Sequence, residues 1–220
     1  MVVLENVTKR YRGPGGDTWV ARDITATFPP GLSIGLLGRN GAGKSSLLRM
    51  IAGVTRPERG RIRRTGSMSW PVGFAGGFHG DLTGAQNARF VARIYGVDPQ
   101  ALVAFVAHFA ELGDHLHRPF RGYSSGMRAR LAFGLSMGIP FDTYLVDEVM
   151  SVGDAAFRTR SEALLHDRLS RGGAIIVSHS LQHLARLCTA GAVLEDGRLT
   201  LHDDIMTAID HHRDNLGVAA

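Results

Sequence analysis

The chain has 220 residues, 44% of them hydrophobic, and 25 basic against 20 acidic side chains, a formal net charge of +5. Its apolar runs fall short of the ~18 residues of a membrane span, its first residues lack a secretory signal pattern, and its lone cysteine, Cys188, excludes an internal disulfide. The length suits one large domain or one core with a small subdomain, and the charge does not choose among an anionic ligand, nucleic acid and a membrane surface.

Three stretches near the N-terminus have the pattern of half-buried strands. Val2–Val7 and Ile24–Phe28 alternate on either side of the glycine-rich turn Arg12–Gly16, and Arg61–Ser69 follows later. We expect these three segments to form a small antiparallel sheet beside a nucleotide.

Residues 38–45 match the phosphate-loop pattern G-x-x-x-x-G-K-[ST] at every fixed position, between an apolar run at Leu32–Leu37 and a helical pattern at Ser46–Ala52. Backbone N–H groups and the helix start would surround phosphate oxygens, Lys44 would reach the β- and γ-phosphates, and Ser45 would bind Mg²⁺. The residues predicted to bind the nucleotide here are Gly38, Arg39, Asn40, Gly41, Ala42, Gly43, Lys44, Ser45 and Ser46. Kinases, GTPases, helicases and transporters all use such a loop, so it does not decide the class.

The middle and end of the chain are mainly helical in pattern. Residues 82–137, including Ala101–Leu112, have helical apolar spacing and predict a helical subdomain. Beyond it we expect an amphipathic helix over Ala155–Leu169, a hairpin over Ala192–Leu201 and a short surface helix over Asp203–Asp214.

Two adjacent carboxylates, Asp147 and Glu148, end the apolar stretch that begins at Phe141. Asp147 is predicted to be the acidic ligand of the phosphate-loop magnesium, and Glu148 is predicted to take a proton from an attacking water. The alternative is a surface Asp-Glu pair at a strand end, and the upstream phosphate loop favours the catalytic interpretation.

The segment Tyr123–Leu131 reads Y-S-S-G-M-R-A-R-L and has two serines at a predicted helix start. A serine followed by free N–H groups is an anion site, although Ser124 also serves as a simple helix cap. In sequence and in position, between the phosphate loop and the carboxylates, the segment resembles the L-S-G-G-Q signature of ABC transporter nucleotide-binding subunits. The resemblance implies that Ser124, Ser125 and Gly126 complete the ATP site of a second subunit.

That resemblance covers nearly the whole chain and implies an α/β fold within one nucleotide-binding domain, 1–220. The implied domain has a P-loop NTPase (RecA-like) core, a small antiparallel β subdomain and a helical subdomain at about 82–137. His179, after the strand pattern Ala174–Val177, would contact the γ-phosphate and the attacking water, and Tyr11 would stack on adenine. ATP and Mg²⁺ are the implied ligands.

The implied partners are a second copy in an ATP-bound homodimer and integral membrane permease subunits, not nucleic acid. The chain would then lie at the cytoplasmic face of the bacterial inner membrane, bound through the permease. Soluble ABC ATPases of translation or DNA repair are the alternative, but they usually carry two cassettes or a long coiled coil.

One departure and one finer resemblance stand out. The family has a magnesium-binding glutamine after the first helix, and the corresponding segment Ser69–Leu82 has none, leaving water, His79 or Asp81 as substitutes. Its glycine-rich run, together with Tyr123–Phe133, resembles the ATP-binding proteins of capsular polysaccharide exporters. O-antigen and teichoic acid exporters share parts of it, and some carry a further C-terminal carbohydrate-binding domain, so a chain ending at Ala220 favours the capsule type. Nothing in the sequence suggests direct glycan binding.

Overall fold

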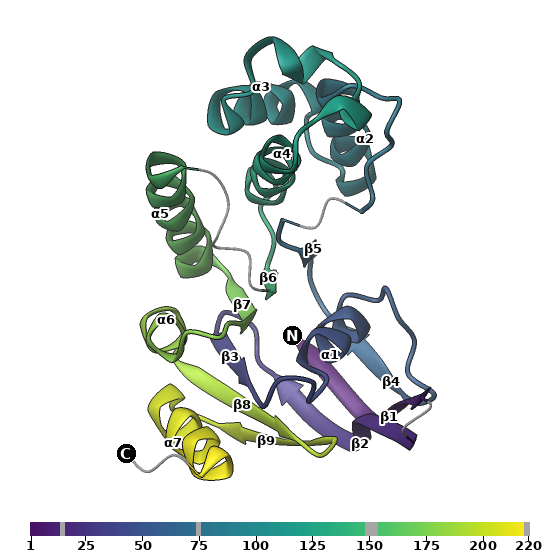
Figure 1. The fold of residues 1–220 in the computed structure, drawn as a ribbon, viewed down its shortest axis with the longest axis vertical. Helices are drawn as coiled ribbons and strands as arrows, with labels where there is room; N and C mark the ends of the chain where they lie inside the picture. The colour runs from purple at the N-terminus through teal and green to yellow at the C-terminus, as the bar shows by residue number, and fades with distance from the viewer. Residues whose placement is uncertain (14–15, 74–75, 148–153, 218–220) are drawn as a thin grey trace. The chain divides into compact units, whose positions relative to one another are not determined.

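The structure is a computed structural model that describes residues 1–13, 16–73, 76–147 and 154–217. The chain divides into two compact units (Figure 1). The first contains Met1–Pro71, Phe141–Glu148 and Leu169–Ala220, and the second contains Val72–Pro140 and Val149–Arg168. Within the described ranges, none of the helices combines the length and the apolar content that crossing a bilayer requires.

An antiparallel sheet with the strand order β2-β1-β4 forms the N-terminal part of the first unit. Its strands are β1 (Val2–Gly13), β2 (Gly16–Phe28) and β4 (Arg59–Arg64). Leu4 and Val7 of β1 are both fully buried although they are three residues apart. An irregularity in the pairing with β2 between them adds the extra residue that returns Val7 to the core side.

The predicted single strand Arg61–Ser69 is wrong, because the chain leaves the antiparallel sheet within it. β4 ends at Arg64, and β5 (Met68–Pro71) belongs to the other sheet. Between them the Asp142 carboxylate accepts hydrogen bonds from the N–H and the hydroxyl of Ser67, at 2.7 and 2.9 Å. These bonds direct the chain toward the start of β6, beside which β5 pairs.

The second sheet has the order β5-β6-β7-β3-β8-β9, with β9 alone antiparallel to its neighbour. Its remaining strands are β6 (Thr143–Asp147), β7 (Gly173–Val177), β3 (Ser33–Leu37), β8 (Ala190–Glu195) and β9 (Arg198–His202). Every residue of β3 and β7 is buried, as expected for parallel strands that are covered on both faces. The predicted hairpin over Ala192–Leu201 is confirmed as β8 and β9. The two sheets are joined where the Arg22 N–H of β2 donates to the Gly197 carbonyl at 2.7 Å.

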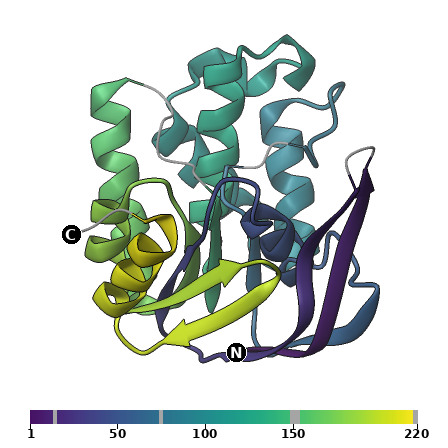
Figure 2. The same cartoon turned by 60° about the horizontal axis from the view of Figure 1, so that its bottom comes forward.

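Three helices of the first unit pack on this sheet: α1 (Lys44–Ile51), α6 (Leu181–Leu187) and α7 (Ile205–Leu216). The predicted surface helix Asp203–Asp214 corresponds to α7, but it is more than a surface element. Ile205, Ala208, Ile209 and His212 are buried at helical spacing, and α7 lies along β8 and β9 in the turned view (Figure 2).

The second unit is helical, with a core that is rich in aromatic rings. Its helices are α2 (Gly84–Tyr95), α3 (Pro99–Ala110), α4 (Ser125–Gly138) and most of α5 (Ala155–Arg171), with short 3₁₀ helices at Gly113–His117 and Phe120–Gly122. The Phe109 ring lies 5.8 Å from that of Phe133 and 5.3 Å from that of Phe157, which joins α3, α4 and α5. A capping box of Thr83 and Gln86 begins α2, and Asp98 caps α3.

Candidate active site

The candidate site lies where three neighbouring strands of the parallel sheet end. Asp147 of β6 pairs with Val177 of β7, and β7 pairs with β3. Because the carboxyl ends of parallel strands meet at one edge, the phosphate loop after β3, Asp147 and His179 all belong to the same edge. This arrangement brings together residues that are more than 100 positions apart in the sequence.

The phosphate loop requires a glycine at its first position. Gly38 has φ +152°, and a Cβ on it would lie 2.3 Å from the Leu194 carbonyl oxygen. The loop ends at α1, which begins at Lys44 after Gly43 and has no side-chain cap. The first-turn N–H groups of α1 and the positive end of its dipole therefore suit an anion such as phosphate. Ser46 lies half-buried in that turn.

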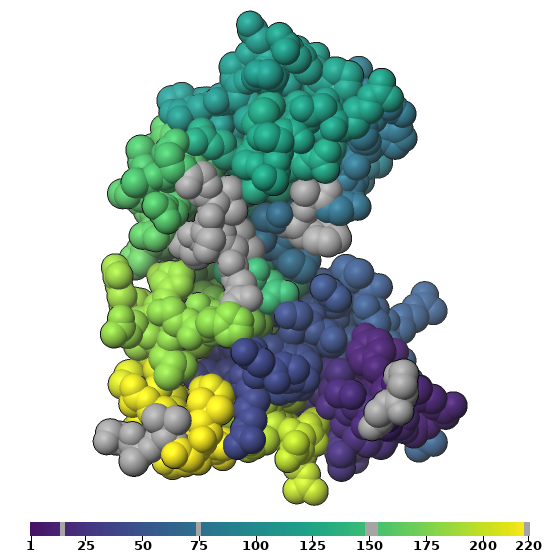
Figure 3. All heavy atoms as spheres, in the orientation of Figure 1, coloured from purple at the N-terminus to yellow at the C-terminus, as the bar shows by residue number. Residues whose placement is uncertain are grey.

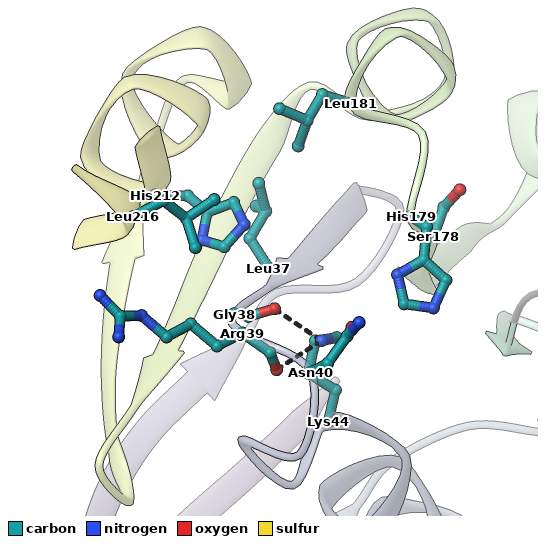
Figure 4. Close-up of a pocket in the computed structure, with 10 residues that line it drawn as sticks. All are labelled: Leu37, Gly38, Arg39, Asn40, Lys44, Ser178, His179, Leu181, His212 and Leu216. Carbon is teal, nitrogen blue, oxygen red and sulfur yellow. Dashed lines mark hydrogen bonds between the residues drawn. The ribbon is translucent and has the colours of Figure 1, made fainter. Parts of the chain in front are cut away.

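Lys44 is 9% exposed and is held inside the loop. Its ammonium donates to the carbonyl oxygens of Gly38 at 2.6 Å and Arg39 at 3.0 Å (Figure 4). Burial lowers the pKa of Lys44, and the negative charge of Asp147 acts in the opposite direction. Phosphate oxygens bound in the loop could therefore replace these two carbonyl oxygens as hydrogen-bond acceptors of the ammonium.

Ser45 and Asp147, the two predicted magnesium ligands, are in direct contact. The Ser45 hydroxyl donates to Oδ1 of Asp147 at 3.1 Å, across 102 residues of sequence. A hydroxyl and a carboxylate are oxygen ligands of the kind that Mg²⁺ prefers, with phosphate oxygens and water completing its octahedron. The described residues contain no cluster of three or more His, Cys, Asp or Glu that would hold a metal alone. The pair therefore fits a magnesium that binds together with a nucleotide.

A cavity of about 480 Å³ adjoins the loop. The loop residues Gly38, Arg39, Asn40 and Lys44 form one side, and His179 lies across from them (Figure 4). His179 is exposed and lies two residues after Val177, the last residue of β7. A second hollow of about 530 Å³ adjoins the outer side of the loop, where Gly41 and Ala42 line it together with residues of β2 and the β8–β9 turn.

Tyr11, the predicted adenine-stacking residue, lies on β1 with 45% of its surface exposed. The Lys9 ammonium is 5.1 Å from the centre of its ring. A base that stacks on this ring would share it with a lysine, or take its other face.

The predicted signature begins α4 in the second unit. Ser124 caps the helix by accepting the Met127 N–H at 3.2 Å, and Ser124 and Ser125 are exposed. Gly126 is half-exposed in the first turn. Arg128 donates from Nε to the Tyr123 carbonyl at 3.1 Å, which fixes a cation beside the helix start. The segment therefore has hydrogen-bond donors at a helix start, which suit an anion.

The chain was compared with known families, proteins and structures. Residues 21–151 match the ABC transporter family. The chain belongs to that family. It is 44% identical over 216 residues to the polysialic acid transport ATP-binding protein KpsT of Escherichia coli, covering 97% of this chain and 96% of that protein. It is 45% identical to the capsule polysaccharide export ATP-binding protein CtrD of Neisseria meningitidis, covering 96% and 98%. The ATP-binding protein BexA of Haemophilus influenzae is 42% identical, over 97% and 99%.

Solved structures agree on the fold. An ATP-binding cassette bound to ADP and Pi superposes with a TM-score of 0.77 at 18% identity, covering 93% of this chain and 99% of that one. The ATP-binding subunit of an ABC transporter gives 0.74 at 20% identity, over 99% and 94%. The predicted family, the resemblance to capsule exporters and the predicted fold class are confirmed, and ATP hydrolysis is the activity that this ABC family membership implies.

The predicted site residues and the residues that the structure places at the site differ in two respects. Glu148, the predicted general base, is outside the described residues. Conversely, His212 and Leu216 of α7 line the cavity beside the phosphate loop, and the ABC motifs did not predict them. Their helical spacing predicts a buried face but not what that face meets.

Proposed function

We propose that this chain is the ATP-hydrolysing subunit of an exporter that carries capsular polysaccharide across the bacterial inner membrane. The observation that carries the proposal is the 43–45% identity, over nearly the full length, to proteins named for capsule or polysialic acid export. An O-antigen export protein of Klebsiella pneumoniae is 35% identical over 80% of the chain, and a teichoic acid export protein of Bacillus anthracis is 31% identical. Those two substrates are the alternatives, and a soluble ABC ATPase is a more distant one.

In the proposed mechanism the loop residues Gly38–Ser46 bind the phosphates of ATP, and Lys44 exchanges its two carbonyl partners for phosphate oxygens. Ser45 and Asp147, 3.1 Å apart, would hold Mg²⁺. When bound, Mg²⁺ supplies positive charge that stabilises the phosphates as the bond to the terminal phosphoryl group breaks.

The proton from the attacking water is assigned to Glu148, the residue after Asp147. His179, across the cavity from Asn40 and Lys44, is assigned to the γ-phosphate and the water. A carboxylate general base contributes roughly 10²–10⁴-fold to the rate. Glu148→Gln keeps the size of the side chain and removes the basic oxygen, so ATP should bind but turn over at least 10²-fold more slowly.

We further propose that two copies assemble head to tail, with Ser124, Ser125 and Gly126 of one copy completing the phosphate site of the other. The exposure of both serines at the positive end of α4 supports this assignment. The Glu148→Gln variant should then trap an ATP-bound dimer that size exclusion detects. If it stays monomeric with ATP and Mg²⁺, even beside its permease, the two-site assembly is wrong.

The proposed membrane partner is a permease, which would keep this chain at the cytoplasmic face. The solvent-facing side of α2 supports a docking role, because Phe90 and Ile94 are 54% and 61% exposed one turn apart. We propose no nucleic-acid partner and no direct contact with the glycan.

The test of the function is a deletion strain complemented with this chain or with Lys44→Ala. We expect polymer to accumulate inside the deleted cells, surface capsule to be lost, and only the wild-type chain to restore it. Loss of O-antigen or teichoic acid instead of capsule would select that alternative. If the deletion strain exports every glycan normally, the transport assignment is refuted.

A further inference from the structure

Helix α7 is seated closely on the parallel sheet of the first unit. A Cβ on Gly191 of β8 would lie 2.2 Å from the Cβ of Ala208, so only a glycine allows the helix to approach this near. Ala208 and Ile209 are buried, and Asp204 caps the N-terminal end of the helix. Packing this close fixes α7 against β8 and β3, and its last turn therefore has a defined position.

That last turn meets the phosphate loop, 176 residues earlier in the sequence. The Arg39 guanidinium donates a hydrogen bond to the backbone carbonyl of Asn215, and its Nε lies 3.8 Å from Oε1 of Glu195 on β8. The carbonyls at the end of a helix are its negative end and stabilise a cation. In the space-filling view, yellow atoms of α7 lie beside blue atoms of the loop region (Figure 3). The second residue of the loop is thus held from outside the loop.

The same turn brings an imidazole to the cavity of the phosphate loop. His212 is 9% exposed and lines this cavity together with Lys44, on the side opposite His179 (Figure 4). Burial lowers the pKa of His212 from 6.5, the positive charges of Lys44, Arg39 and His211 lower it further, and Glu195 raises it. The imidazole is therefore neutral near pH 7 in the nucleotide-free protein.

We propose that the last turn of α7 is a wall of the phosphate site, in which His212 is a positioning residue for the bound phosphates and Arg39 connects the helix to the loop. The proposal rests on ATP binding at the phosphate loop, as proposed above. It adds to that site a segment which lies far outside its sequence motif.

Phosphate bound in the loop would add negative charge near the His212 imidazole. Its oxygens compensate the Lys44 ammonium and attract an imidazolium, so the pKa of His212 is higher in the complex than in the free protein. Binding then takes up a proton. The gain in affinity is complete at pH values below the pKa of His212 in the free protein. It is lost as the pH rises through the pKa of His212 in the complex. A difference of one unit between the pKa of His212 in the free protein and in the complex corresponds to about a ten-fold change in affinity.

The test is calorimetric titration of the full chain with the Mg²⁺ complex of a non-hydrolysable imido analogue of ATP. Titrations near pH 7 in buffers of different ionisation enthalpy give the number of protons taken up. We expect net proton uptake by the wild type and no such uptake by His212→Gln. The affinity of this variant for the analogue should be about three- to ten-fold weaker than that of the wild type at pH 6.5 and equal to it at pH 8.5. His211→Gln is the matched control on the same helix and should keep the uptake.

Two outcomes overturn the inference and leave the proposed function standing: wild-type protein that binds the analogue without taking up protons, or proton uptake that persists in His212→Gln. Absence of binding by the wild type would instead refute the proposed nucleotide site. If His212→Gln fails to fold, NMR titration of the histidines in the wild type serves the same purpose. A His212 pKa that does not rise on adding the analogue contradicts the proposal.

Discussion

Replacing Lys44 with methionine separates the fold of the phosphate loop from its ligand binding. In the free protein the change removes two hydrogen bonds, at 2.6 and 3.0 Å, from an ammonium to backbone carbonyls. Each such bond contributes about 1.5–3 kcal/mol. Burial of the ammonium, which already lowers its pKa, offsets part of that loss. We expect a net destabilisation of about 1–2 kcal/mol, or a Tm lower by about 2–8 °C for a chain of this size.

The effect on nucleotide binding should be larger. Mg-ATP at a hundred times its Kd stabilises a folded protein by about 2.7 kcal/mol, which corresponds to a Tm rise of about 5–11 °C. If methionine weakens binding about 100-fold, the same ATP concentration stabilises the variant by only about 0.4 kcal/mol, a rise below about 2 °C.

Thermal unfolding with and without Mg-ATP measures both quantities. Arg49→Met is the matched control, because Arg49 is an exposed cation on the same helix and should keep the full ATP-dependent rise. A Lys44→Met protein that retains the wild-type rise would refute the assignment of Lys44 to the phosphates.

Three further outcomes follow from the described residues. Asp147→Asn should bind ATP with a weaker dependence on Mg²⁺, measured by titration with and without the metal, since it leaves Ser45 as the remaining side-chain ligand of the pair. Cys188, whose pKa burial raises to about 12, should resist alkylation at pH 8 until the protein is unfolded by urea, and rapid labelling of the native chain would contradict its placement. Leu165→Ala, at a fully buried position of α5, should cost about 2–5 kcal/mol of unfolding free energy by urea titration, against less than about 0.5 kcal/mol for exposed Glu162→Ala.

Local patterns predicted the elements that hold the phosphate loop. A buried strand, a glycine loop and an amphipathic helix are each encoded within a few residues, so the strand β3 and the helix α1 lie within about two residues of their predicted bounds. The hairpin at Ala192–Leu201 was predictable for the same reason. The division of Arg61–Ser69 between two sheets was not, because it depends on hydrogen bonds from Ser67 to Asp142, 75 residues away.

The candidate site was predictable to a similar extent. Ser45 and Asp147 are in contact as expected, because a motif fixes each residue type and its position after a strand. His212 was not predictable, since a helix with buried residues at helical spacing has no local signal for the surface on which it packs. Contacts between distant segments are decided by tertiary packing rather than by local pattern.

The joining of the two sheets in the first unit bears on the dimensions of its ligand. Tyr11 lies on the antiparallel sheet and the phosphate loop follows a strand of the parallel one, and the sheets are tied by the Arg22–Gly197 bond and by the Ser67–Asp142 bonds. Those ties set the separation between the aromatic ring and the loop. If Tyr11 stacks on adenine, as the family resemblance implies, a nucleotide that touches both the ring and the loop must match this separation, while the ring itself would accept any base.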